Sequence, residues 1–306
     1  MGNAILAVGL NPVMQKTILL RQLWENEVNR SDRYYFTVAG KGANTARVLT
    51  ELGAEVLHLT HAGGNYEHMF RSMLREDQVP LFAADSGSEI RLCYTLINEE
   101  KHTVTEIVEE AKPVLSDTDR QVRRLYQQLL EQAQLITISG TKAAGYSDDI
   151  IPWMVRLACE AGKRVILDIK GRDLLESIPF KPYIIKPNMK EFSETLFPDQ
   201  LFREHETEKD IRREVEKKMI ELYEELGTIT VLTRGARSVL YCSDGSIAER
   251  TVTPVKPLNS IGSGDSFTAG LTFGVSRGLS MAESIDIAVS CGKKNAQLIK
   301  PGTITG

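Results

Sequence analysis

A glycine-rich turn followed by an acid is the part of this sequence best suited to chemistry. In the stretch NSIGSGDSFTAG, the turn is Gly262, Ser263 and Gly264, and the acid is Asp265. The apolar residues that follow recur every four positions, which predicts a helix. Backbone N–H groups at a helix N-terminus bind anions, because the positive end of the helix dipole lies there. An aspartate beside a bound phosphate is useful when it accepts the proton of an attacking hydroxyl. The stretch therefore predicts phosphoryl transfer with Asp265 as base, and the alternative is that Asp265 only caps the helix.

A second glycine-rich turn lies near the other end of the chain, in VAGKGANTARVLTELG. There Gly40 precedes Lys41, and Asn44 follows in the first turn of an expected helix. The lysine could neutralise a phosphate, and the asparagine can both donate to and accept from sugar hydroxyls. The spacing is not that of a P-loop, and no GxGxxG follows the first expected strand, which disfavours a nicotinamide enzyme. The alternative for this segment is a tight strand-to-helix turn.

Composition excludes several classes of function. The chain has 306 residues and a formal net charge of −4 without a long basic run, so we expect no nucleic-acid partner. Its apolar runs are too short for a membrane span, and we expect no signal peptide and no membrane partner. The four cysteines are widely spaced, which indicates neither a disulfide framework nor a zinc site. These features together predict a cytoplasmic protein.

Apolar strands alternate with amphipathic helices along most of the chain. This alternation predicts an α/β fold, a doubly wound and mostly parallel sheet with helices on both faces. Two β-prone regions without a helix, about 12–38 and 89–109, predict a small sheet that acts as a lid within a single domain, 1–306. A lid would exclude water from phosphoryl transfer. The expected strands are 4–10, 54–60, 135–139, 164–169, 183–186 and 228–233, and the expected helices include 121–134, 151–162 and 207–226.

The two glycine-rich segments together resemble the paired signatures of PfkB-type carbohydrate kinases, in the ribokinase-like superfamily. The resemblance spans nearly the whole chain, and it is greatest for the branch of 1-phosphofructokinases, 6-phosphofructokinases and tagatose-6-phosphate kinases. Its further landmarks are NP (11–12), NEVNR (26–30), IR (90–91), TEIVE (105–109), SGT (139–141), LD (167–168), KPNMKE (186–191) and TRGA (233–236). The resemblance implies a ribokinase-like fold and a cytoplasmic kinase that uses ATP and Mg²⁺, with a monovalent cation as a further cofactor to consider. It also implies a homodimer formed through the lid.

The resemblance implies roles for individual residues on the nucleotide side. Asp265 would be the base, and the backbone of Gly262, Ser263 and Gly264 would form the anion hole for the transferred phosphoryl group. The implied ATP-binding residues are Lys186, Asn188, Thr233 and Gly235, and the implied metal contacts, through water, are Asn188 and Glu191. Without the resemblance, KPNMKE reads as a strand-end turn and a capped helix.

The resemblance also implies residues that bind the sugar phosphate. They are Gln15, Arg30, Gly40, Lys41, Asn44 and Arg91. Arg91, Arg30 and Lys41 would form a cationic cluster for the phosphate that the acceptor already carries, since arginine binds phosphate through two hydrogen bonds.

The sequence departs from the family pattern mainly on the acceptor side. Gln15 stands where the branch usually carries an aspartate, and Lys170 adds a cation after the strand that ends at Asp168. The leading interpretation is an ATP-dependent kinase of a hexose phosphate, fructose 1-phosphate or fructose 6-phosphate. The alternatives are a kinase of an unphosphorylated sugar or nucleoside, a catalytically silent sugar-binding regulatory protein on the same fold and, furthest from the pattern, a dehydrogenase. Which hydroxyl is phosphorylated, the oligomeric state and allosteric regulation do not follow from the sequence.

Overall fold

A nine-stranded sheet forms the centre of the described structure. The computed structural model describes residues 3–197 and 208–305, and its sheet has the order β13-β12-β11-β10-β9-β8-β1-β4-β5. The strands from β11 to β5 are parallel; β12 continues the sheet antiparallel to β11, and β13 is antiparallel to β12. The strands are β1 (Ala4–Val8), β4 (Val56–Ala62), β5 (Leu81–Asp85), β8 (Ala133–Ser139), β9 (Arg164–Asp168), β10 (Ile184–Ile185), β11 (Ile229–Thr233), β12 (Ser238–Cys242) and β13 (Ile247–Thr251).

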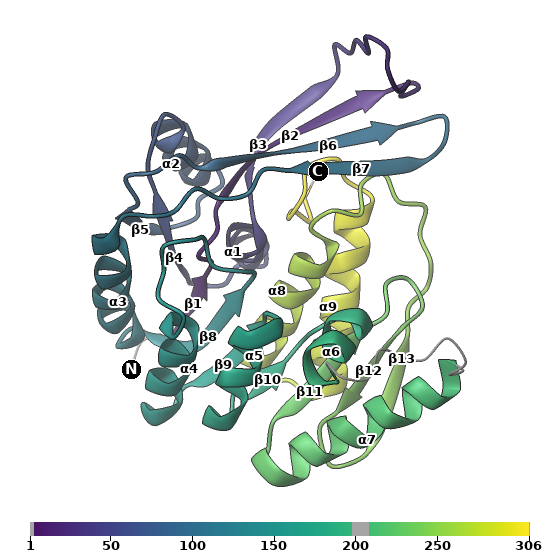
Figure 1. The fold of residues 1–306 in the computed structure, drawn as a ribbon. Helices are drawn as coiled ribbons and strands as arrows, with labels where there is room; N and C mark the ends of the chain where they lie inside the picture. Colours follow the sequence, from purple (N-terminus) through teal and green to yellow (C-terminus); the bar gives the residue numbers. More distant parts are fainter. Residues whose placement is uncertain (1–2, 198–207, 306) are drawn as a thin grey trace.

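Helices cover both faces of this sheet (Figure 1). One face packs on α1 (Lys41–Glu51), α2 (Glu67–Glu76), α8 (Ser263–Ser276) and α9 (Met281–Ala296). The other face packs on α3 (Ser116–Leu130), α4 (Ile150–Glu160), α5 (Gly171–Ser177), α6 (Met189–Leu196) and α7 (Glu208–Leu226), and the short 3₁₀ helix η1 (Ile178–Phe180) follows α5. None of these helices is both long and apolar enough to cross a membrane.

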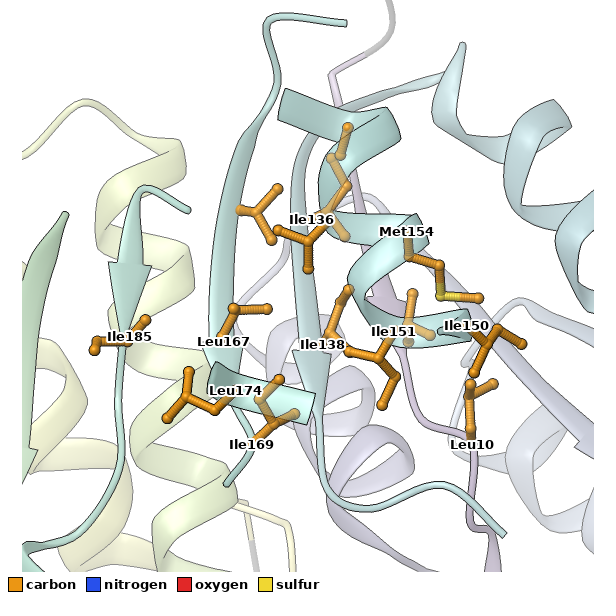
Figure 2. Close-up of a cluster of buried hydrophobic side chains, with 14 of the residues drawn as sticks. Leu10, Ile136, Ile138, Ile150, Ile151, Met154, Leu167, Ile169, Leu174 and Ile185 are labelled. Atoms are coloured by element: carbon orange, nitrogen blue, oxygen red, sulfur yellow. The ribbon is translucent and has the colours of Figure 1, made fainter. Parts of the chain in front are cut away.

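Alternate residues of each central strand fill the two layers of the core. Leu167 on β9 points to the layer of α4 and α5, whereas its neighbour Ile166 points to the layer of α8 and α9. Figure 2 shows the first of these layers, in which the labelled side chains are Leu10, Ile136, Ile138, Ile150, Ile151, Met154, Leu167, Ile169, Leu174 and Ile185. Strands buried on both faces explain the nearly continuous apolar runs in the sequence.

A second sheet of four strands lies beyond the carboxyl end of β1, set apart from the main sheet (Figure 1). Its order is β3-β2-β6-β7, from β2 (Val13–Leu20), β3 (Tyr34–Ala39), β6 (Arg91–Asn98) and β7 (Thr103–Val108). We call this sheet the lid. The predicted fold class is confirmed: a mostly parallel sheet with helices on both faces and a small second sheet.

Candidate active site

Gly262, Ser263 and Gly264, which we call the anion loop, lie at the N-terminus of α8. The backbone shape of this loop requires glycine. Gly262 is the N-cap of α8 and adopts the left-handed region with a φ of 81°. A Cβ atom at Gly262 would lie 2.5 Å from the backbone nitrogen of Gly302. Asp265 is the third residue of the helix and makes no capping hydrogen bond. The alternative that Asp265 is only a helix cap is therefore wrong.

Asn295 on α9 holds this loop in place. Its side-chain oxygen accepts hydrogen bonds from Ser266 Oγ at 3.0 Å and from the Gly302 backbone at 2.7 Å. Its amide nitrogen donates to the Ile261 carbonyl at 2.8 Å and to Ser263 Oγ at 3.1 Å. A fully buried amide thus ties the loop to the last turn of α9. The sequence analysis missed Asn295, because one asparagine near a helix end carries no motif.

Asp265 is oriented by a chain of hydrogen bonds from α1. Asn44 Nδ2 donates to Asp265 Oδ2 at 2.8 Å, and Arg47 donates to Asn44 Oδ1 at 3.2 Å. Arg47 is only 1% exposed and is itself paired with Asp77 at 2.6 Å. The second carboxylate oxygen of Asp265, Oδ1, has no hydrogen-bond partner within the described ranges. It is therefore free to accept a bond from a hydroxyl group.

The electrostatic surroundings of Asp265 suit a base. Burial raises the pKa of Asp265, and nearby Asp168 raises it further, against the opposing effect of Lys41 and the Asn44 hydrogen bond. A carboxylate with a raised pKa holds an abstracted proton better than an ordinary one.

Asp168, at the end of β9, pairs with two of the predicted ligand-binding lysines. Its oxygens lie 3.1 Å from Lys41 Nζ and 3.4 Å from Lys186 Nζ, and one accepts a hydrogen bond from Thr268 at 2.7 Å. Burial opposes the charge of Asp168, but the two lysines and Thr268 outweigh it and hold its pKa at about 2. The same carboxylate raises the pKa of Lys41. Both lysines are thus already paired, and Asp168 is a site residue that the sequence analysis did not assign.

The larger of two cavities gathers most of the predicted nucleotide-side residues. It has a volume of about 1440 Å³, and its lining includes Asn188, Thr233, Gly235, Ser263 and Gly264. Gly262 and Lys186, which were predicted for the same side, are not among its lining residues. Apolar side chains complete the wall, including Val239, Val252, Phe267 and Val289. A helix N-terminus together with apolar walls suits a nucleotide, which has charged phosphates and a flat base.

The smaller cavity, of about 460 Å³, lies between the lid and the carboxyl ends of the main strands. Of the predicted substrate residues, Gly40, Lys41 and Arg91 line it, and Gln15, Arg30 and Asn44 do not. Gln15 is 3% exposed and donates a hydrogen bond to Thr95 within the lid. Arg30 is exposed in the loop between β2 and β3. Asn44 instead contacts Asp265, as described above.

Buried polar atoms without partners gather around the smaller cavity. Four such atoms belong to residues that line it: Asn11 Oδ1, His58 Nε2, Arg91 Nε and Ser139 Oγ. Burial lowers the pKa of His58 to about 4. His58 Nδ1 lies 3.0 Å from the Ala7 carbonyl oxygen, so Nδ1 carries the proton of the neutral ring and Nε2 is an acceptor. Unpaired buried groups are costly, so the walls of this cavity contain polar groups that the described residues do not satisfy. The cavity is also lined by Glu106 and Lys170.

The predicted metal contacts form a helix cap. Asn188 is the N-cap of α6; its Oδ1 accepts from the Glu191 backbone at 2.9 Å, and Glu191 Oε2 accepts from the Asn188 backbone at 3.0 Å. Glu191 Oε1 has only a loose contact, 3.9 Å from Lys41 Nζ. Within residues 3–197 and 208–305, no group of three or more His, Cys, Asp or Glu side chains could hold a metal alone. The residues fit Mg²⁺ carried by phosphates and reached by Glu191 through water.

The chain matches the sequence model described as "pfkB family carbohydrate kinase" over residues 8–305.

Several solved structures share the fold at low sequence identity. Phosphofructokinase-2 from Escherichia coli, in complex with substrates and products, is 22% identical, with a TM-score of 0.85 over 97% of this chain and 94% of that one. A possible 1-phosphofructokinase from Thermotoga maritima is 20% identical, with a TM-score of 0.85 over 97% and 93%. Ribokinase from the same organism is 15% identical, with a TM-score of 0.71 over 98% and 94%. These similarities establish the ribokinase-like fold.

Proposed function

This chain belongs to the pfkB family of carbohydrate kinases and is an ATP-dependent sugar kinase, and we propose that its acceptor is a hexose phosphate, with fructose 1-phosphate and fructose 6-phosphate as first candidates. One observation carries the proposal. Asp265, whose Oδ1 is unpaired among the described residues, directly follows the anion loop, and this loop borders the larger cavity. Asp265 also contacts Asn44 on α1, and the first residues of α1 line the smaller cavity. A base in that position can serve a nucleotide on one side and a sugar on the other.

In the proposed reaction, a sugar hydroxyl in the smaller cavity gives its proton to Asp265 Oδ1 while its oxygen attacks the γ-phosphorus of ATP. The bond from phosphorus to the β–γ bridging oxygen breaks, and ADP leaves. We propose that the backbone N–H groups of Gly262 and Gly264 hold the transferring phosphoryl group, and that Ser263 joins them once its N–H releases the Ser260 carbonyl, to which it donates at 3.2 Å. Donors fixed before the reaction are the most effective stabilisers of that charge. Asn295 keeps them fixed.

On the nucleotide side, we propose that Thr233 and Gly235 contact ATP and that Asn188 orders α6 beside it. Lys186 would act on the phosphates only through its pair with Asp168, or after that pair opens. Mg²⁺ would neutralise phosphate charge when bound with ATP, with Glu191 as the water-mediated contact. One solved phosphofructokinase-2 is a complex with potassium, which supports keeping a monovalent cation in the proposal.

On the acceptor side, we propose that Gly40, Asn44, Asn11 Oδ1 and Ser139 Oγ serve the sugar end, since neither of these two oxygens has a partner among the described residues. Arg91 would hold the phosphate of the acceptor, because its guanidinium has no ion-pair partner in the described part of the chain. Lys41 contributes less charge than its sequence position suggests, since Asp168 neutralises it.

Gln15 and Arg30 would act less directly than the resemblance implies. Gln15 would support the lid through Thr95. Arg30 would bind a phosphate only where the lid of a second subunit brings it close, because it does not line the smaller cavity of its own chain.

We propose that the chain is one domain, 1–306, with its lid strands inserted at about 12–38 and 89–109, that it is cytoplasmic and that it dimerises through the lid. Tyr34 and Ile107, on the lid, are 57% and 53% exposed. Exposed large apolar side chains mark interaction sites, which supports a second subunit packed against the lid. One solved phosphofructokinase-2 is an inhibited tetramer. Light scattering at several concentrations tests the dimer, and a concentration-independent monomer would contradict it.

An unphosphorylated sugar is the second candidate acceptor, and the small number of free cations in the smaller cavity favours it, because Arg30 does not line the cavity and Asp168 neutralises Lys41. A coupled ADP-release assay with Mg-ATP separates the two candidates. The acceptors are fructose 1-phosphate, fructose 6-phosphate, tagatose 6-phosphate, fructose, ribose and adenosine. Turnover confined to phosphosugars supports the proposal, and turnover confined to the other three acceptors contradicts it.

A further inference from the structure

Glu106 is an unpaired carboxylate in the smaller cavity. Three acidic side chains line this cavity, and two of them, Asp168 and Glu191, lie within 4 Å of Lys41 Nζ, at 3.1 and 3.9 Å. Glu106 has neither an ion pair nor a side-chain hydrogen bond to any residue that the structure describes. Glu106 is exposed on β7, so its unpaired carboxylate is accessible to a ligand that enters the cavity.

The position of Glu106 on the lid places it beside Gln15 and Thr95. Thr95 on β6 is the cross-strand partner of Glu106 on β7, and Gln15 on β2 is the partner of Cys93. Cys93 and Thr95 are two residues apart and share one face, so Gln15, Thr95 and Glu106 also share it. Gln15 donates its amide proton to Thr95. One lid face therefore carries an amide, a hydroxyl and a carboxylate in a row.

Glu106 also lies close enough to Asp265 to be affected by its charge. Burial raises the pKa of Glu106, and Asp265 raises it further. Figure 1 shows β7 along the border of the lid that faces α8, the helix that carries Asp265. An acceptor whose hydroxyl reaches Asp265 would therefore have further hydroxyls within reach of the lid carboxylate.

We propose that Glu106 is a specificity-determining residue that accepts hydrogen bonds from acceptor hydroxyls near the reacting one, in place of the carboxylate that Gln15 does not provide. Hydrogen bonds from hydroxyls to a carboxylate are about twice as strong as neutral ones. The same charge repels a phosphate, which Arg91, further along the same lid face, and Lys170, after β9, attract. Glu106 therefore orients the acceptor with its hydroxyls toward Asp265 and its phosphate away. This inference rests on the proposed function and names the class of acceptor: a polyhydroxylated phosphomonoester with a free hydroxyl beside the reacting carbon.

The test is Glu106→Gln, which keeps the size of the side chain and removes its charge. We expect the KM for the acceptor to rise about tenfold, which corresponds to about 1.4 kcal/mol. We expect kcat to change less than about threefold, since the change removes ground-state and transition-state binding alike, and the KM for ATP to stay constant. The matched control is Glu100→Gln, which removes the same charge at the β6–β7 turn, where the residue does not line the cavity.

A deoxy acceptor makes the test specific to hydrogen bonding. With an acceptor that lacks the hydroxyl next to the reacting carbon, Glu106→Gln should raise the acceptor KM by a factor at least about threefold smaller than with the parent sugar. The reason is that the hydrogen bond from this hydroxyl to Glu106 is already missing. Equal effects of Glu106→Gln and Glu100→Gln, or a lower acceptor KM in Glu106→Gln, would overturn the role of Glu106 and leave the kinase intact. Absence of wild-type turnover on every sugar phosphate would instead overturn the proposed function, and this inference with it.

Discussion

The two sides of the site are built from different parts of the chain. The nucleotide side depends on backbone: Gly262 begins the anion loop, and Ser263 and Gly264 border the larger cavity. The acceptor side depends on side chains that meet from the lid and from the ends of the main strands, such as Arg91, Glu106 and Ser139.

This difference explains where the sequence departs from its family. Backbone N–H groups serve every phosphate donor alike, so the loop has little freedom to change. Side chains on the lid or after a strand end can be exchanged without altering the sheet, and Gln15 on the lid and Lys170 after β9 are such departures. The comparison predicts that changes on the nucleotide side impair all reactions, and that changes on the acceptor side alter the choice of acceptor.

Gly262→Ala should have the largest effect, because it changes the loop itself. The left-handed φ of 81° strains an alanine, and its Cβ would lie 2.5 Å from the Gly302 nitrogen. We expect displacement of the loop to lower the kcat/KM of the variant about 10²-fold with every acceptor. We also expect the free energy of unfolding to fall by about 1–3 kcal/mol. Activity and chemical denaturation measure the two effects.

Gly264→Ala is the control for stability. A Cβ atom at Gly264 meets no protein atom within 4 Å, and the residue does not have a positive φ. Its free energy of unfolding should stay within about 0.5 kcal/mol of the wild type. Equal destabilisation by both alanines would show that the loop does not depend on the backbone shape of Gly262.

Arg91→Ala should have a smaller and more selective effect. Arg91 lines the smaller cavity, and among the described residues its guanidinium donates only to the Glu109 carbonyl, at 3.2 Å, which leaves it available to a phosphate. We expect the KM for a sugar phosphate to rise about tenfold or more, in line with the loss of a charge-assisted hydrogen bond, and the KM for ATP to stay within about twofold. Arg30→Ala is the control, because it removes a cation from the exposed loop of the lid and not from the smaller cavity. A parallel rise in the KM for ATP, or a larger effect of Arg30→Ala, would contradict the assignment.

Asp168 should stabilise the protein at neutral pH and lose this effect in acid. Its pKa of about 2 lies below the ordinary value of 3.8, so its ion pairs stabilise the protein above pH 3.8 and are lost as the pH falls toward 2. This difference corresponds to about 2 kcal/mol. Urea unfolding of the wild type between pH 6 and 2, buffer conditions permitting reversible unfolding, should show a steeper loss than Asp168→Asn. Parallel curves would show that the carboxylate is not held ionised by Lys41 and Lys186.

Much of the fold follows from the sequence, because buried parallel strands leave continuous apolar runs. The expected strand 164–169 is β9, and the expected strand 228–233 is β11, each within a residue at either end. β13 was missed, because its residues Ile247–Thr251 are half-buried or exposed at the sheet edge and leave no apolar run. The helix α9 was missed as well, since several of its buried positions are small or polar, such as Ser284, Ala288 and Asn295.

The site was predictable where it is local and not where it is assembled from distant segments. Asp265 and the loop before it lie within four consecutive residues. Asp168 meets Lys41 across 127 positions of sequence, and spacing cannot predict such a contact. The lining of the smaller cavity by Glu106, and not by Gln15, likewise depends on the register of β6 with β7.

Asp265→Asn provides the most direct test of the central claim, that the carboxylate after the anion loop activates the acceptor hydroxyl. The measurement is single-turnover transfer from ATP to the best acceptor, together with the Kd of each ligand by calorimetry; the surface variant Asp286→Asn is the control. We predict transfer at least about 10²-fold slower than in the wild type, with both Kd values within about threefold, because the amide keeps the shape and loses the basic oxygen. Transfer at the wild-type rate by folded Asp265→Asn would contradict the claim.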